Sequence, residues 1–167
     1  MDVSELLRIA RDTIESVTYC FAITVSQHGE ANARIILPRK LEEDWSVDFG
    51  TIKTSRKYRE IESSDRLTLA YQNDHDRAYV SLLGQPLIID DIELKRSRWS
   101  AFTEAQREFA LRWNPKGPDD PDLVYVRLMT KRIEIWSSEH GVMPEPIGYS
   151  AAVLTRNGNF GWKYSKT

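Results

Sequence analysis

The sequence has little of several things, and each shortage narrows what the protein can be. Its single cysteine, Cys20, cannot form an internal disulfide, and no Asn-x-Ser/Thr glycosylation site occurs. No apolar run approaches the length of a membrane-spanning helix, and the N-terminus lacks the basic and apolar regions of a signal peptide. These shortages favour a cytoplasmic protein with no membrane partner.

The sequence also has no excess of positive charge, since the net charge is -2 over 167 residues. A general nucleic-acid binder carries a basic excess, so nucleic acid is not an expected partner. The three histidines are far apart and Cys20 stands alone, so we expect no metal site. No Gly-rich phosphate loop and no nucleophile elbow occurs. The acidic pairs Asp90–Asp91 and Asp119–Asp120 lie before a predicted helix and in a proline-rich loop, so the catalytic residues stay unknown.

The hydrophobic content of 41% is enough for the core of one domain spanning residues 1–167. Apolar residues four apart predict an N-terminal amphipathic helix over residues 3–16. Alternation with period two predicts several short strands, and two further segments have helical patterns. The predicted strands are 19–26, 32–37, 45–51, 67–71, 78–89, 123–129 and 132–136. The two further predicted helices are 55–62 and 91–112, and the pattern of the latter allows either one helix or two shorter ones.

The order of these segments decides the fold class. Many short strands with few helices indicate a mostly β, α+β protein, a small barrel of antiparallel strands over residues 17–136. A doubly wound fold would need regular alternation of strands and helices, which is absent. The turn at 27–30 predicts a hairpin, and Gly84 is a candidate bulge in a long strand. Residues 137–167 show little periodicity, so we expect an irregular C-terminal tail with at most one strand.

A basic cluster occurs where a predicted strand meets the helix at 55–62. It contains Lys53, Arg56, Lys57 and Arg59, alongside the hydroxyls of Thr51, Thr54 and Ser55. Hydroxyls, backbone N–H groups at a helix start, a two-pronged Arg and a Lys point charge together suit a phosphate monoester. The alternative is a solvated helix start with Arg59 and Glu62 paired, and composition alone favours that alternative.

Two single residues also invite a functional reading. Arg34 lies in an apolar strand between Ala33 and Ile35, and a charge there needs a partner unless it faces solvent. If strands 32–37 and 45–51 are neighbours, Arg34 comes near Thr51 and Ser55. Trp136 ends a strand, where it either packs in a core or dimer interface or flanks a flat cofactor ring.

Taken in order, these pieces resemble the pyridoxamine 5'-phosphate oxidase-like family of FMN-binding split barrels. The similarity runs from about Val17 to Trp136. It rests on Ala33-Arg34-Ile35-Ile36, Gly50-Thr51, Ser55-Arg56-Lys57, Gly84 and Ile135-Trp136. The segment Trp113-Asn-Pro-Lys-Gly-Pro-Asp-Asp-Pro121 is similar to a loop of the general stress protein branch.

The resemblance implies a split β-barrel, FMN as cofactor, and a homodimer with FMN at the interface. It assigns the phosphate to Arg34, Arg56 and Lys57, with hydroxyl donors from Thr51 and Ser55. Backbone at 34–36 and 50–51 would line the flavin, and Trp136 would approach the ring from the other subunit. The cofactor-binding residues implied are Arg34, Ile35, Ile36, Gly50, Thr51, Ser55, Arg56, Lys57, Tyr79 and Trp136.

The sequence also departs from the family's oxidases. Tyr79 stands where they carry a flavin-contacting Gln, and residues 137–144 lack their Arg-x-His-x-Arg element, which grips the vitamin phosphate. Arg39 matches one of their substrate-side Lys residues, but it does not restore the site. We therefore expect an FMN-dependent oxidoreductase with an unidentified small-molecule substrate or electron donor, not pyridoxamine phosphate oxidation. The alternatives are a non-catalytic flavin-binding protein for stress response or flavin buffering, and a split barrel that binds haem, a deazaflavin or a partner protein.

Overall fold

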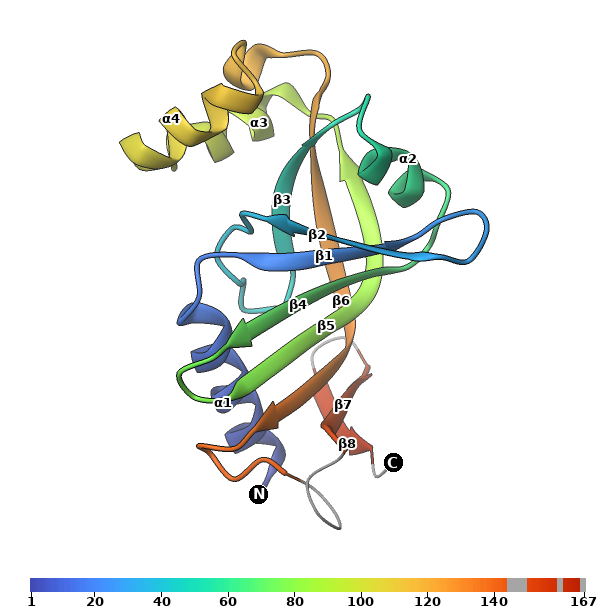
Figure 1. Ribbon diagram of the computed structural model, residues 1–167, viewed down its shortest axis with the longest axis vertical. Coiled ribbons are helices and arrows are strands. Elements are labelled where there is room, and N and C mark those ends of the chain that lie inside the picture. Colours follow the sequence, from blue (N-terminus) through green and yellow to red (C-terminus); the bar gives the residue numbers. More distant parts are fainter. Residues whose placement is uncertain (144–149, 159–160, 166–167) are drawn as a thin grey trace.

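The computed structural model describes residues 1–143, 150–158 and 161–165, and its strands form one eight-stranded antiparallel sheet (Figure 1). Neighbouring strands follow the order β2-β1-β4-β5-β6-β7-β8, and β3 pairs with β6 off this path. The predicted α+β class with antiparallel strands is confirmed. The strands are β1 Cys20–Val25, β2 Ala31–Ile36, β3 Val47–Ile52, β4 Leu67–Asn73, β5 Ala78–Ile89, β6 Leu123–Ser137, β7 Ala152–Asn157 and β8 Gly161–Ser165.

Four α-helices surround the sheet, and each begins at a side-chain cap. Asp2, Ser55, Asp91 and Thr103 accept hydrogen bonds from backbone N–H groups in the first turns, as expected for these residue types. The helix α1 contacts β4, β5 and β8 at one end of the molecule, whereas α3 and α4 lie at the other (Figure 1). The helices are α1 Val3–Glu15, α2 Arg56–Glu62, α3 Ile92–Ser100 and α4 Glu104–Trp113, followed by a 3-10 turn at Gly117–Asp119.

The two long strands β5 and β6 pair along their length, with one irregularity. The register shifts between Leu83 and Gly84, as the sequence predicted for this glycine. A Cβ atom at Gly84 would lie 2.0 Å from the carbonyl oxygen of Met129, so the strands can approach this closely only with glycine. The bulge lets the pair bend around the core.

The hairpin of β1 and β2 presents its larger apolar side chains to the outside. Phe21 pairs with Ile35 in register, and these side chains are 40% and 64% exposed. The smaller residues Cys20, Ala22 and Thr24 face the core instead. Alternation predicted a half-buried strand, but it could not say which face is buried. The structure leaves an apolar outer surface that extends to the next register pair, Ile23 and Ala33.

Three sequence expectations need correction. Residues 123–137 form the single strand β6, not two strands. Trp45 precedes β3 with φ 66 and is not part of the strand. The segment after residue 137 contains β7 and β8, so it is not an irregular tail. It is anchored to the rest of the molecule by Trp162, whose ring meets that of Trp45 edge to face with centroids 5.9 Å apart, and by Arg156, which donates a hydrogen bond of 3.2 Å to the Thr130 carbonyl. These tertiary contacts leave no periodic pattern in the sequence.

Candidate functional site

The end of β3 and the start of α2 bring two hydroxyl groups together. Ser55 caps α2, and its Oγ accepts a hydrogen bond of 3.1 Å from the backbone N–H of Tyr58. The Oγ1 atom of Thr51 lies 3.2 Å from the same Oγ. Both residues line a cavity next to α2. The sequence therefore placed these hydroxyls correctly beside one another, at the junction of a strand and a helix.

Lys57 projects from α2 into the same cavity. Its Nζ lies 5.2 Å from the centroid of the Phe49 ring, and among the described residues no carboxylate lies within ion-pair distance of it. Burial, followed by the positive charge of Arg34, lowers the pKa of Lys57 to about 8, against an opposing effect of Cys20. A half-buried ammonium group without a counter-ion is a site for an anion.

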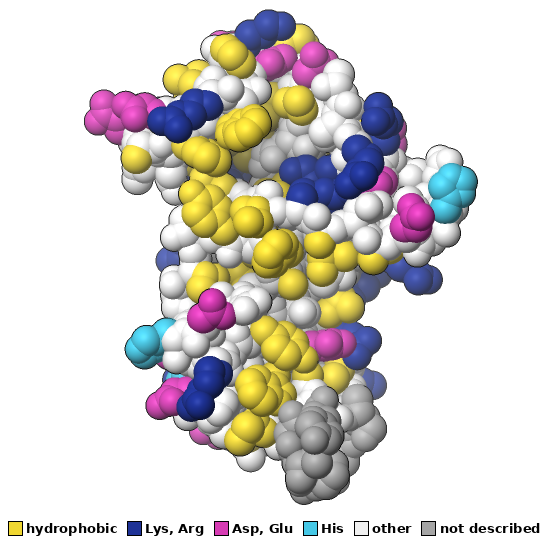
Figure 2. Space-filling view, in the orientation of Figure 1, with side chains coloured by type: hydrophobic (Ala, Val, Ile, Leu, Met, Phe, Trp, Pro, Cys, Tyr) yellow, Lys and Arg dark blue, Asp and Glu magenta, His cyan; other side chains and the backbone are white. Residues whose placement is uncertain are grey.

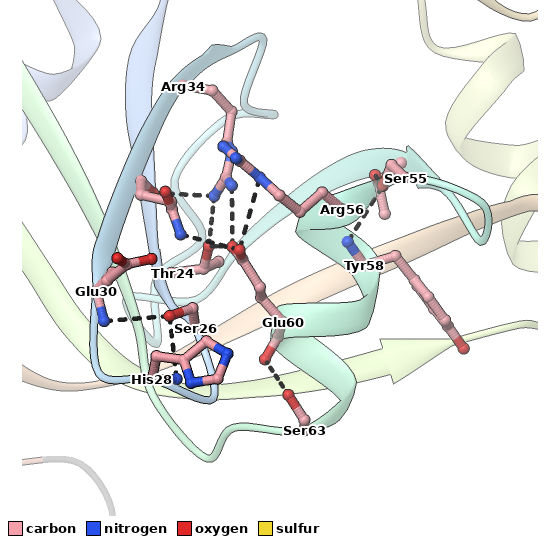
Figure 3. Close-up of polar contacts among 12 residues, drawn as sticks. Thr24, Ser26, His28, Glu30, Arg34, Ser55, Arg56, Tyr58, Glu60 and Ser63 are labelled. Atoms are coloured by element: carbon pink, nitrogen blue, oxygen red, sulfur yellow. Dashed lines mark hydrogen bonds and ion pairs between the residues drawn. The ribbon is translucent and has the colours of Figure 1, made fainter.

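Arg34 and Arg56 meet at the carboxylate of Glu60 on α2 (Figure 3). The Nη2 of Arg34 is 2.9 Å from Glu60 Oε2, and the Nε of Arg56 is 3.6 Å from Oε1. Glu60 also accepts hydrogen bonds from Asn32, at 2.9 Å, and from the hydroxyl of Thr24. Burial alone would raise the pKa of Glu60, but the Thr24 hydroxyl and the Arg34 guanidinium hold it below its ordinary value. Two guanidinium groups against one carboxylate leave a positive excess.

The route by which Arg34 reaches this position differs from the one expected. β2 is an edge strand that pairs with β1, whereas β3 pairs with β6, so the two strands are not neighbours. Arg34 shares the inner face of the hairpin with Thr24 and points toward α2 (Figure 3). The alternative ion pair between Arg59 and Glu62 does not form among the described residues. Glu62 accepts a hydrogen bond from the Tyr58 hydroxyl at 3.0 Å instead.

The cavity beside α2 has a volume of about 550 Å³. This is within the range of small-molecule and cofactor sites. Its polar end is formed by Thr51, Ser55 and Lys57, and strand residues Ile35, Ile36 and Gly50 form one side. Figure 2 shows Lys and Arg side chains on one side of a hollow and hydrophobic side chains over α3 and α4 on the other. The aromatic residues that line that far end are Trp99, Phe102, Phe109 and Trp113.

Tyr79 and Trp136 lie elsewhere within one chain. They are register partners across β5 and β6, and they line a second cavity of about 370 Å³ together with Phe21. Ile35, opposite Phe21 on the hairpin, lines the larger cavity. The two cavities therefore open on adjacent parts of the same apolar face. The structure brings together most of the expected site residues, but it does not bring Tyr79 and Trp136 to Lys57.

Sequence reasoning missed Glu60 and the aromatic end of the cavity. The spacing of Arg56 and Glu60, four residues apart on a helix, could have indicated the ion pair. Phe109 and Trp113 are likewise four apart, so a helix presents both on one side. The sequence pattern does not show that these two side chains are exposed or that they line a cavity.

Within residues 1–143, 150–158 and 161–165, no group of three or more His, Cys, Asp and Glu side chains is arranged to hold a metal ion. Over the same part of the chain, no helix combines the length and apolar character needed to cross a membrane.

Comparison with known proteins gives the family and the fold. The model of the family described as pyridoxamine 5'-phosphate oxidase like matches residues 5–159. No curated protein matches the chain at a significant level.

Several solved structures share the fold at low sequence identity. A pyridoxamine 5'-phosphate oxidase-related, FMN binding protein from Nostoc punctiforme is 16% identical, with a TM-score of 0.71 over 95% of this chain and 93% of that one. PhzG from Burkholderia lata, solved with tetrahydrophenazine-1-carboxylic acid, is 18% identical, with a TM-score of 0.70 over 98% and 90%. A Clostridium acetobutylicum protein related to general stress protein 26 is 19% identical, with a TM-score of 0.66 over 83% and 92%. The fold is thus the split barrel that the sequence predicted.

Proposed function

The chain belongs to the pyridoxamine 5'-phosphate oxidase-like family, and from this premise we propose that it is an FMN-binding protein, an oxidoreductase that works as a homodimer. The observation that carries the proposal is Lys57. A half-buried ammonium group without a carboxylate partner among the described residues lines a cavity beside the hydroxyls of Thr51 and Ser55. This combination is the donor set that a phosphate monoester requires.

Arg34 and Arg56 extend the phosphate site. Glu60 holds the Arg34 guanidinium in a fixed orientation through an ion pair of 2.9 Å, so little side-chain entropy remains to be lost on binding. Because Glu60 neutralises only one of the two guanidinium groups, positive charge is left for a dianionic phosphate. The strand residues Ile35, Ile36 and Gly50 would lie along the flavin, since they form the wall beyond the hydroxyl groups.

A homodimer completes the site. The outer face of the β1–β2 hairpin is apolar, and Ile35 belongs both to this face and to the cavity wall. A second copy of the chain seated on this face would cover Phe21 and Ile35 and bring its own Trp136 and Tyr79 toward the flavin. This arrangement accounts for the separation of Trp136 from Lys57 within one chain, and it supports FMN at the interface.

When bound, FMN supplies the electron-transfer chemistry, while the protein binds, orients and shields it. The described residues around the cavity include no carboxylate or histidine, so we assign no acid or base. His140 donates or accepts at 3.0 Å from Ser137, and the surrounding residues 137–143 contain no arginine to grip a vitamin phosphate. Pyridoxamine phosphate oxidation is therefore not proposed. A non-catalytic role in flavin buffering or stress is the second candidate, favoured by this lack of acid–base groups.

The test is an FMN titration of the purified protein, followed by absorption and fluorescence. We expect one FMN per chain, with quenched flavin fluorescence. A colourless protein that leaves FMN fluorescence unchanged would overturn the proposal. Addition of NADH or NADPH to the loaded protein then separates the two candidates, because bleaching of the flavin with electron transfer to an acceptor supports an oxidoreductase and stable oxidised flavin supports buffering.

A further inference from the structure

Lys57 is a half-buried lysine that no acidic side chain among the described residues neutralises. It lines the cavity of about 550 Å³, and its Nζ lies 5.2 Å from the centroid of the Phe49 ring. Lys53, in the same segment of the chain, is held instead by Asp90, whose carboxylate lies 2.7 Å from the Lys53 Nζ. The two lysines are close in sequence but differ in their chemical surroundings.

The thiol of Cys20 lies close enough to act on Lys57 and would neutralise it if the thiol ionised. Cys20 is buried in the core, and this burial raises the pKa of its thiol to about 12, against opposing effects of a hydrogen bond from Tyr71 and the charge of Lys57. The thiol is therefore neutral at physiological pH, and it leaves the ammonium group of Lys57 uncompensated.

Burial and like charge both favour the neutral amine form of Lys57. Removal from water destabilises the ammonium group, and the Arg34 guanidinium repels it, so the pKa of Lys57 falls to about 8. At pH 8 about half of the molecules in solution therefore carry a free amine at this position. A desolvated lysine amine without a counter-ion is a nucleophile.

The groups around this amine suit an anion once the nitrogen has reacted. Arg34 and Arg56 share the single carboxylate of Glu60, at 2.9 Å and 3.6 Å, so positive charge remains in excess (Figure 3). Thr51 and Ser55 have two hydroxyl protons between them, and their mutual contact of 3.2 Å uses one. The other proton can be donated to a group in the cavity that both residues line.

We propose that Lys57 is a modification site that takes up carbon dioxide as a carbamate. The neutral amine attacks the carbon atom of carbon dioxide, a C–N bond forms, one C=O π bond opens onto oxygen, and the nitrogen releases a proton to solvent. The product is a planar anion whose two oxygens accept hydrogen bonds from Arg34 and from the free hydroxyl proton. Two guanidinium groups then face two anions, so the reaction removes the repulsion between Lys57 and Arg34.

The carbamate has a regulatory consequence, and this consequence rests on the proposed function. It replaces a positive charge with a negative one where the flavin phosphate would bind, so carbon dioxide should weaken FMN binding. Bound FMN should in turn protect Lys57, because a dianionic phosphate keeps the ammonium group protonated. Carbamate formation itself needs no cofactor, so it is tested on the full chain without FMN.

The full chain is equilibrated at pH 8 with isotopically labelled bicarbonate as the source of carbon dioxide. The carbamate is trapped as its ethyl ester with triethyloxonium and located by peptide mass spectrometry. We expect the label on Lys57 and none above background on Lys53, because the hydrogen bond from Lys53 to Asp90 raises the pKa of that lysine and keeps it protonated. Saturating FMN should lower the Lys57 label at least about tenfold. No label on Lys57, or equal labelling of the two lysines, would overturn the inference.

The effect on the cofactor is measured by FMN titration in bicarbonate and in sodium chloride of equal ionic strength. Bicarbonate should weaken FMN binding to the wild type but not to Lys57→Arg, which keeps the positive charge and has no amine of comparable reactivity. Equal weakening in the variant would overturn the regulatory consequence, since bicarbonate would then compete only as a dissolved anion. FMN uptake without label on Lys57 sinks this inference alone, whereas label without FMN uptake sinks the proposed function and leaves the carbamate site standing.

Discussion

The guanidinium of Arg34 lies 2.9 Å from the carboxylate of Glu60, and this ion pair ties the edge strand β2 to the helix α2. The two residues are 26 positions apart in the sequence. No strand pairing brings them together, because β2 pairs only with β1 and Glu60 lies on a helix. In the proposed phosphate site, Glu60 positions the arginine, and its single negative charge leaves the combined charge of Arg34, Arg56 and Lys57 positive.

Glu60→Gln should destabilise the fold, because the network loses its charge-assisted hydrogen bonds. At pH 7 we expect the free energy of unfolding to fall by about 1.5–3 kcal/mol. The folded state holds the pKa of Glu60 below the ordinary value of 4.5, so its contribution is present above that pH and disappears as the pH falls through the lower folded-state value. Urea denaturation of both proteins at several pH values measures the difference. Glu62→Gln is the control, and an equal loss in both variants would contradict the assigned role.

Lys57 should make FMN binding sensitive to pH. Burial lowers the pKa of Lys57 to about 8 in the free protein, and a bound dianionic phosphate would raise it. Binding above pH 8 therefore takes up a proton, and the FMN affinity should fall by up to about tenfold per pH unit until the pKa of the complex is reached.

Titrations between pH 7 and pH 9 measure this dependence, and calorimetry in buffers of different ionisation enthalpy measures the proton uptake. Lys57→Arg is the matched variant, because a guanidinium stays protonated throughout this range. The same slope in Lys57→Arg as in the wild type would show that another group titrates.

Ile35→Asp should prevent the proposed homodimer. The side chain is 64% exposed on the apolar face of the hairpin, and a carboxylate in a dimer interface would be desolvated without a partner. We expect a monomer by light scattering and an FMN affinity lowered at least about tenfold, because the partner's side of the site is lost. Ile92→Asp, which changes another exposed isoleucine on α3, should keep the wild-type mass. A dimeric Ile35→Asp protein would place the interface elsewhere.

Gly84→Ala should cost far more stability than Gly50→Ala. The added Cβ at Gly84 would meet the Met129 carbonyl oxygen at 2.0 Å, whereas at Gly50 the nearest atom, Leu123 Cδ1, is 3.7 Å away. Separation of β5 from β6 at the bulge should lower the free energy of unfolding by more than about 3 kcal/mol. Thermal unfolding of the two variants gives the comparison, and similar midpoints would refute the close approach.

The sequence predicts local elements well where their own pattern specifies them. The first helix, the β1–β2 hairpin, the Ser55 cap and the Gly84 bulge all follow from residue types and periods that act over a few positions. The location of Arg34 beside Glu60 could not be predicted in this way, because a helix and not a neighbouring strand provides the contact. The full extent of the β7–β8 hairpin and the exposed aromatic side chains of α4 were missed for a related reason, because Trp162 packs against Trp45 and Phe109 against Tyr19, which are distant in the sequence.

The central claim is that a flavin phosphate binds at Lys57, and the most direct measurement compares FMN with riboflavin, which lacks the phosphate. Fluorescence titrations of both flavins are made with the wild type, Lys57→Ala and Arg59→Ala, the last removing an exposed charge from the same helix. We expect the wild type and Arg59→Ala to prefer FMN strongly. Lys57→Ala should lose about 10- to 150-fold in FMN affinity with little change for riboflavin, corresponding to the loss of one charge-assisted contact. An unchanged preference for FMN in Lys57→Ala would show that the phosphate binds elsewhere.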